Sequence, residues 1–331
     1  MIRVVYRPAQ FGGYVALLLT AGALLAGSLV ASVELPTGTV GVQVGLVLTA
    51  AVAGVLEHKR LLGPFETTGF DRADVTNALA VVAGAVVTYV LSVHAGFGPV
   101  LASALVGLLA GLALPRIDVP AYCGSFVGMA SPVAFPSLES VVLAGLIAGL
   151  GFVATTETFG GVGGKLGTLA FFGCLTAAAF VGLEFDAAGA PQWDLVSLIV
   201  PVGAAGAAAT VVSSVRLEWG PVVGSAVVGV VAGVVFPLAV PELGATLAAV
   251  AFCASFVGMS NPARLSLGAV VLAGGLCGVV FLVVTPAFPG AGGKLGTTAF
   301  VSCLAVLGGR ELYDGVVSVL SWVRKTAETG V

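Results

Sequence analysis

The chain has 331 residues, of which 58% are hydrophobic and 9% charged, and its formal net charge is −3. Soluble domains carry roughly 25% charged residues, so this composition excludes a water-exposed surface for most of the chain. It predicts an all-α polytopic membrane protein. The basic residues are scattered rather than clustered, so the lipid bilayer is an expected partner and nucleic acid is not.

Apolar stretches long enough to cross a bilayer follow one another along the chain. A helix needs about 20 apolar residues to cross the hydrocarbon core of a membrane. Arg3 and Arg7 precede the first stretch, which is longer than the apolar core of a signal peptide. We predict about ten to twelve transmembrane helices, with candidate spans at 13–33, 39–56, 75–94, 97–114, 119–135, 138–156, 166–183, 194–213, 219–236, 243–259, 265–285 and 295–309.

The segment after the last span has a different pattern. Val316, Val319, Leu320 and Val323 recur at helical spacing among polar residues. This pattern is typical of an amphipathic helix that lies in the membrane interface. Residues 310–331 are therefore predicted to form an interfacial C-terminal tail.

The sequence also repeats itself. Residues 121–129 and 251–259 share the pattern Cys-x-Ser-Phe-Val-Gly-Met, and residues 163–168 return unchanged as 292–297, Gly-Gly-Lys-Leu-Gly-Thr. A duplicated half is typical of transporters and channels built around a pseudo-two-fold axis. We predict two N-terminal helices with a cytoplasmic loop, followed by two five-segment repeats and the tail, with boundaries at 1–74, 75–183, 194–309 and 310–331.

The distribution of basic residues bears on the orientation of the two repeats. If segment 119–135 crosses the membrane, each repeat crosses an odd number of times and the repeats are inverted. With a cytoplasmic N-terminus, all of the 13 lysine and arginine residues except Lys294 then lie on the cytoplasmic side. If the segment is re-entrant, Lys165, Arg216 and Lys294 all lie outside. The positive-inside rule therefore favours inverted repeats. We expect the protein to lie in the cell membrane.

Two prolines argue for an interrupted helix in the first Cys-x-Ser-Phe-Val-Gly-Met segment. Pro120 and Pro132 bracket it, and the uninterrupted stretch between them is short for a membrane span. We therefore expect broken or re-entrant helices here. Non-helical backbone at membrane depth is tolerated where protein or a water-filled cavity covers it. Whether these segments span or re-enter stays open at this stage.

The two Gly-Gly-Lys-Leu-Gly-Thr copies are the strongest candidate site. Glycines allow backbone N–H groups to converge, a helix N-terminus adds further donors, and a lysine adds a full positive charge. This combination suits a small anion. It is not a nucleotide P-loop, because the first glycine and the final Ser/Thr of that motif are missing. The alternative is a tight turn whose lysine reaches for lipid head groups. The candidate binding residues are Lys165, Gly163, Gly164, Thr168, Lys294, Gly292, Gly293 and Thr297.

The Cys-x-Ser-Phe-Val-Gly-Met copies are the second candidate. Ser125 and Ser255 can hydrogen-bond between helices, and Asn261 precedes a proline that frees backbone carbonyls. These groups would suit a pore-lining broken helix. The alternative is close helix packing through serine and glycine, which is common in membranes.

Catalysis has little support in the sequence. Gly-x-Ser-x-Gly and His-Glu-x-x-His patterns are both missing, and the only histidines are His58 and His94. We predict no catalytic residue, no metal ligand and no cofactor. The expected function is a transporter or channel that moves a small solute or ion, an anion in particular, between the two repeats. The alternatives are a membrane scaffold or assembly protein and a lipid-handling enzyme. The solute, the coupling ion and homo-oligomer formation stay open.

Overall fold

The computed structural model describes residues 2–31, 37–62 and 70–329. These residues form twelve α-helices and no β-strand. Five helical stretches are long and apolar enough to cross a membrane, and five shorter helices are also apolar. The all-helical prediction is therefore confirmed for the described part of the chain.

Two helices precede the segments predicted as repeats. They are α1 (Ile2–Ala31) and α2 (Thr37–Leu61). The first predicted repeat holds α3 (Arg72–Tyr89), α4 (Pro99–Ala113), α5 (Asp118–Val127), α6 (Leu138–Ala154) and α7 (Lys165–Val181). The second holds α8 (Val196–Val211), α9 (Gly220–Ala239), α10 (Gly244–Gly258), α11 (Leu267–Val283) and α12 (Lys294–Thr329). Each predicted span thus coincides with one helix. A five-residue π-helical turn extends α3 and another extends α8, at Val90–His94 and Val212–Arg216.

Local sequence explains where several helices begin and end. Asp71 caps α3 by accepting hydrogen bonds from the backbone N–H groups of Ala73 and Asp74, at 2.8 and 3.2 Å, which satisfies donors that a helix start leaves free. α5 ends at Val127, well before the predicted boundary at residue 135. Gly128 and Pro132 account for the early end, because proline disfavours helical backbone in the residue before it.

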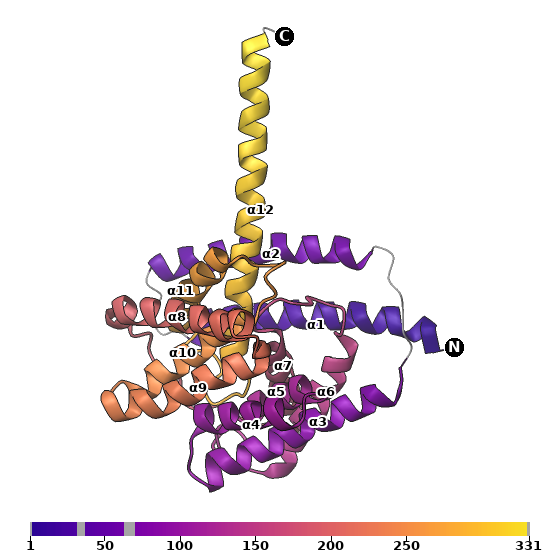
Figure 1. Cartoon of the computed structure of the whole chain (residues 1–331), viewed down its shortest axis with the longest axis vertical. Coiled ribbons are helices and arrows are strands. Elements are labelled where there is room, and N and C mark those ends of the chain that lie inside the picture. Colours follow the sequence, from indigo (N-terminus) through magenta and orange to yellow (C-terminus); the bar gives the residue numbers. More distant parts are fainter. Residues whose placement is uncertain (1, 32–36, 63–69, 330–331) are drawn as a thin grey trace.

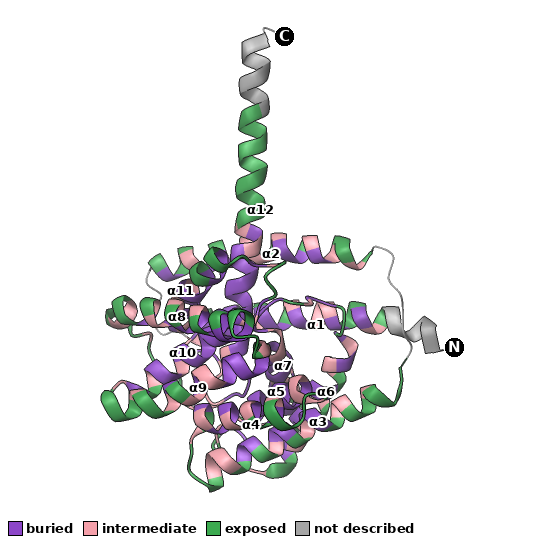
Figure 2. Cartoon of the chain, in the orientation of Figure 1, coloured by how far each residue is buried: buried purple, intermediate pink, exposed green. Residues whose placement is uncertain are grey.

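α12 is longer than predicted and its outer part projects alone from the helical bundle (Figure 1). Residues 310–321 are exposed along this projection (Figure 2). The segment predicted as a separate interfacial helix is continuous with α12. Its exposed apolar side chains include Val316, Val319 and Leu320, whereas the side chain of Val323 lies outside the described residues.

The helices of the two predicted repeats pack in a matching pattern. α3 packs on α5 and α6, and α8 packs on α10 and α11. Likewise α4 packs on α5 as α9 packs on α10, and α6 packs on α7 as α11 packs on α12. Outside this pattern, α2 lies along α12, and α1 contacts α6, α7 and α12.

Corresponding helices meet in antiparallel pairs at the centre. In the α4–α9 pair, Gly111 lies against Val223, and Gly233 lies against Leu101. The α7–α12 pair crosses at Gly167 and Gly296, where neither residue has room for a Cβ atom. Small residues at such crossings let membrane helices approach closely. The crossing of α7 and α12 brings the starts of both helices, and hence both lysines, into the middle of the fold.

Candidate functional site

The lysine of each repeated motif joins the start of one helix to the end of the preceding helix. Lys165 Nζ donates a hydrogen bond to the carbonyl of Thr155, which caps the C-terminus of α6. Lys294 Nζ donates to the carbonyl of Thr285 at 2.9 Å, just after α11. Both lysines are half-buried. An ammonium has three N–H donors, so each lysine keeps donors for a solute after this bond.

The glycine turns before the lysines press against the opposite half of the molecule. The N–H of Gly163 donates to Ser260 Oγ at 3.0 Å, and a side chain on Gly163 would collide with the carbonyl oxygen of Phe256. In the same way, a side chain on Gly292 would collide with the carbonyl oxygens of Phe126 and Val127. These glycines permit close backbone contact. The Gly163 N–H is already used, so the lysine is the stronger of the predicted anion donors here.

Gly164 and Gly293 hold the tightest point of each turn. Both have φ +81°, and each lies against the backbone of the opposite crossing helix. The left-handed conformation favours glycine because a Cβ atom would be strained there. Thr168 and Thr297 follow inside the helices, where their hydroxyls donate to the carbonyls of these two glycines at 3.1 and 3.3 Å. The threonines therefore do not point their donors toward a shared site.

Each lysine lines a separate pocket. The Lys165 pocket, of about 280 Å³, lies between the two halves of the chain and is lined by Lys165 with Val119, Phe126, Phe152, Thr156, residues 160–164, Leu166, Gly167, Pro221, Val222, Phe256 and Met259. The Lys294 pocket, of about 460 Å³, is lined by Lys294 with Gly189, Ala190, Gln192, Thr246, Ala249, Phe281, Leu282, Val284, Thr285, Leu295 and Thr298. In both linings the lysine is the only charged residue.

The two pockets lie toward opposite ends of α10. Thr246 and Ala249, near its start, line the Lys294 pocket, whereas Phe256 and the following Met259 line the Lys165 pocket. Thirteen helical steps separate Thr246 from Met259, and at 1.5 Å per residue this is about 20 Å. The two pockets are therefore well separated along α10.

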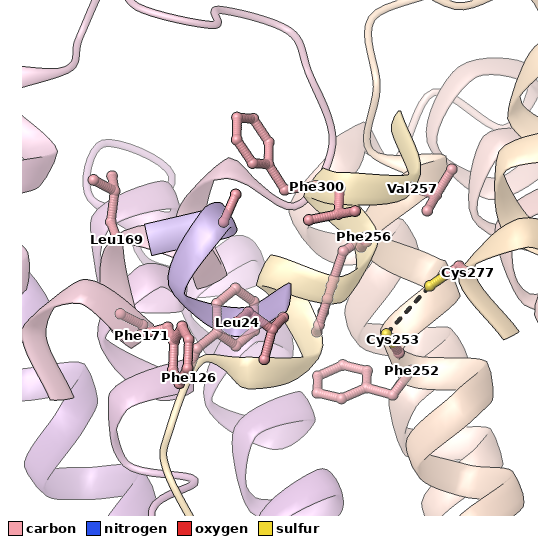
Figure 3. Close-up of a cluster of buried hydrophobic side chains, with 14 of the residues drawn as sticks. Leu24, Phe126, Leu169, Phe171, Phe252, Cys253, Phe256, Val257, Cys277 and Phe300 are labelled. Carbon is pink, nitrogen blue, oxygen red and sulfur yellow. Dashed lines mark hydrogen bonds between the residues drawn. The ribbon is translucent and has the colours of Figure 1, made fainter. Parts of the chain in front are cut away.

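Four aromatic rings fill the centre between α5 and α10. Tyr122, Phe126, Phe252 and Phe256 form this aromatic cluster, and all four are buried. The ring centroids of Phe126 and Phe256 lie 4.6 Å apart, as do those of Phe252 and Phe256. Figure 3 labels Phe126, Phe252 and Phe256, with Cys253 next to Phe252 and a dashed line from Cys253 to Cys277. Phe126 and Phe256 also line the Lys165 pocket, so the aromatic cluster forms part of the wall of that pocket.

The predicted serines lie beside the aromatic cluster, in hydrogen-bonded pairs. Ser125 pairs with Ser103 at 2.8 Å, and Ser255 pairs with Ser225 at 2.7 Å. The hydroxyl of Tyr122 lies 3.0 Å from Ser225 and so links the two halves. All of these hydroxyls are buried, and none lines the two lysine pockets.

Asn261 lies apart from the serines, in the exposed loop after α10. Its N–H donates to the carbonyl of Gly161 at 2.9 Å, and its side-chain oxygen accepts from the N–H of Ala263. The structure thus brings Lys165, Gly163 and Gly164 to one pocket and Lys294 to another. Outside both pocket linings lie Ser125, Ser255, Thr168, Thr297 and Asn261. Gly292 and Gly293 also lie outside them, directly before Lys294 at the start of α12.

Sequence reasoning missed one charged cluster. Glu57 in α2 is buried and pairs with Arg264 at 2.6 Å. Glu57 comes directly after the span predicted at 39–56, so it was indistinguishable from an ordinary loop carboxylate. The apolar run gave no signal for it, because Glu57 begins the charged sequence Glu-His-Lys-Arg even though the helix continues to Leu61.

Comparison with other proteins adds nothing to this geometry. No family model matches the chain, and neither a curated protein nor a solved structure matches it.

Proposed function

We propose that this chain is a membrane transporter or channel that moves a small solute, an anion in particular, between two inverted five-helix units. The observation that carries the proposal is the pair of pockets that hold corresponding lysines. Each pocket has one lysine and no acidic residue in its lining. A lone half-buried ammonium with spare donors would attract an anion and orient it by hydrogen bonds.

The inverted relation of the units is supported by their contacts. A two-fold axis perpendicular to the helices makes corresponding helices antiparallel, as α4 and α9 are. Corresponding hydrogen bonds also cross between the halves: Ser131 N–H donates to Gly290 O at 2.8 Å, and Asn261 N–H donates to Gly161 O at 2.9 Å. In transporters with inverted repeats, the substrate site lies near the midplane at the interface of the repeats.

The proposed path joins the two pockets along α10. The Lys165 pocket would open to one side of the membrane and the Lys294 pocket to the other, with the aromatic cluster as the barrier between them. Rocking of one unit against the other would separate the rings of Phe126 and Phe256. The distribution of basic residues supports a cell-membrane protein with a cytoplasmic N-terminus.

A membrane scaffold or assembly protein is the second candidate. It is favoured by the tight packing of the centre, where the four aromatic rings are buried and Gly167 and Gly296 meet without space for a methyl group. A lipid-handling enzyme has weaker support, since each lysine pocket offers a single titratable side chain.

Solute flux in proteoliposomes distinguishes these functions. The purified full chain should carry small monovalent anions across the membrane faster than protein-free liposomes allow, and should carry neutral solutes and cations of similar size poorly. Flux of neutral solutes or cations alone would keep the path but reject the anion site. Background flux for the whole panel, with a correctly folded protein, would reject transport in favour of the scaffold.

A further inference from the structure

The loop before Lys165 forms one wall of the Lys165 pocket and is held by helices outside the two units. This Lys165 loop comprises residues 155–164, and Thr156 and residues 160–164 line the pocket. Gln10 of α1 accepts hydrogen bonds from the N–H of Glu157 and the hydroxyl of Thr158, at 3.3 and 3.1 Å. The first half of the loop is therefore fastened to α1.

Phe159 is the strained point of the loop. Its φ is +49°, in the left-handed region, which costs free energy for a residue with a side chain. Two contacts to the N-terminal helices offset this cost. The ring of Phe159 stacks on Tyr14 of α1, with centroids 5.8 Å apart, and its N–H donates to Glu57 Oε1 of α2 at 2.7 Å.

The same carboxylate reaches the second unit. Glu57 Oε2 accepts a hydrogen bond from Arg264 at 2.6 Å, and only 2% of the Glu57 side chain is exposed. Arg264 lies in the loop between α10 and α11, which also bonds to the Lys165 loop through Asn261. Glu57 thus ties α2, the Lys165 loop and the second unit together. Its other partner, Arg60, is 3.6 Å away and 47% exposed, so that pair contributes little.

A cavity beside Glu57 and Arg264 leaves room for this ion pair to separate. A cavity of about 300 Å³ is lined by Glu57, Arg264 and Phe159, together with Arg310, Glu311 and Asp314 of α12. Glu311 and Asp314 are alternative carboxylate partners for a displaced Arg264. The pair can therefore separate without leaving the guanidinium in an apolar environment.

The corresponding loop of the second unit is held differently. In this Lys294 loop, residues 285–293, Gly290 accepts from the Ser131 N–H and Pro289 accepts from the Asp186 N–H. Asp186 in turn accepts from the Ser131 hydroxyl at 3.0 Å. Within the described residues, no arginine or lysine pairs with Asp186. Phe288 of this loop has φ +44° and its ring lies against Gly27 of α1, so strain and a contact to α1 are common to both loops. Among the residues that the structure describes, only the Lys165 loop is also held by an ion pair.

We propose that Glu57 and Arg264 form a latch through which α2 controls the opening of the Lys165 pocket and not of the Lys294 pocket. This assigns a one-sided gating role to α2, which lies outside the repeats. When the pair is intact, the Lys165 loop stays on α1 and α2. When Arg264 moves to the α12 carboxylates, the strained backbone at Phe159 relaxes and the pocket wall opens.

Thiol labelling tests the latch without any transport assay. Val162→Cys places a thiol in the Lys165 pocket, at a side chain that is only 5% exposed, and Thr285→Cys places one in the Lys294 pocket. The five native cysteines are buried. The full chain in lipid nanodiscs exposes both faces to a hydrophilic maleimide. Glu57→Gln should raise the labelling rate at Val162→Cys by roughly tenfold or more, because it unpairs a buried ion pair. The rate at Thr285→Cys should stay unchanged.

Two further variants protect this test. Arg264→Gln breaks the pair from its more exposed side and should raise labelling at Val162→Cys in the same way, even if Glu57→Gln does not fold. Arg60→Gln removes only the weak neighbouring pair and should leave both rates unchanged. An unchanged rate at Val162→Cys in the Glu57→Gln and Arg264→Gln backgrounds would overturn the latch. An equal rise at both thiols would also overturn it, because that result indicates loosening of the whole bundle.

Discussion

Replacement of Gly167 or Gly296 by leucine should prevent the two halves from assembling. At the α7–α12 crossing each glycine lies against the backbone of the other, and a Cβ atom on either would overlap the Cα of its partner. Backbone cannot move aside as a flexible side chain can. Overpacking of a filled core typically costs about 1–3 kcal/mol and sometimes more, and we expect the upper end of this range or beyond. The purified variants should unfold at a much lower temperature or aggregate.

A second glycine-to-leucine change controls for loss of glycine itself. Gly22 of α1 and Gly268 of α11 both have open space where a Cβ atom would lie. Gly22→Leu and Gly268→Leu should therefore keep the unfolding temperature of the parent protein, or raise it slightly, since leucine favours helix more than glycine does. Equal unfolding temperatures for Gly167→Leu and Gly22→Leu would contradict the close crossing.

Replacement of either lysine by alanine should abolish solute flux while the protein still folds. Lys165 and Lys294 are the only charged residues in their pocket linings, so each variant leaves an uncharged pocket. The structural loss is one hydrogen bond from an ammonium to a carbonyl at a helix end, worth about 1.5–3 kcal/mol because the donor is charged. We expect at least a tenfold fall in anion flux, which corresponds to about 1.4 kcal/mol, from a protein that still unfolds cooperatively.

Charge-retaining and remote variants separate the two roles of the lysines. Lys165→Arg and Lys294→Arg keep a positive charge and should retain part of the flux. Lys59→Ala removes an exposed lysine of α2 that lines neither pocket, and its flux should equal that of the parent protein. Normal flux in both Lys165→Ala and Lys294→Ala would exclude the anion site.

The helix positions were predictable because long apolar helices leave a strong local signal. A long apolar run has one main interpretation in a chain with few charges, and every predicted span coincides with an observed helix. The errors lie where a signal was weak. α5 ends at Val127 because glycine and proline interrupt an otherwise apolar stretch. α12 continues past residue 309 to Thr329, so the tail that was predicted as a separate interfacial helix is part of α12.

The candidate site was predictable in position but not in its contacts. The repeated motif identified Lys165 and Lys294, yet their bonds to Thr155 and Thr285 reach back 10 and 9 positions, across the loop that precedes each helix. The glycine turns were expected to present free N–H groups, whereas Gly163 bonds to Ser260 in the other half. Glu57 and Arg264 lie 207 positions apart, and no local pattern connects residues at that separation.

In the proposed mechanism, two inverted units present one lysine pocket to each side of the membrane. Sided labelling of Thr156→Cys and Thr285→Cys in sealed proteoliposomes of uniform orientation measures this arrangement, with a membrane-impermeant maleimide added first outside and then inside. We expect each thiol to react from one side only, the two sides to be opposite, and labelling of either thiol to block anion flux. Reaction of both thiols from the same side would contradict it.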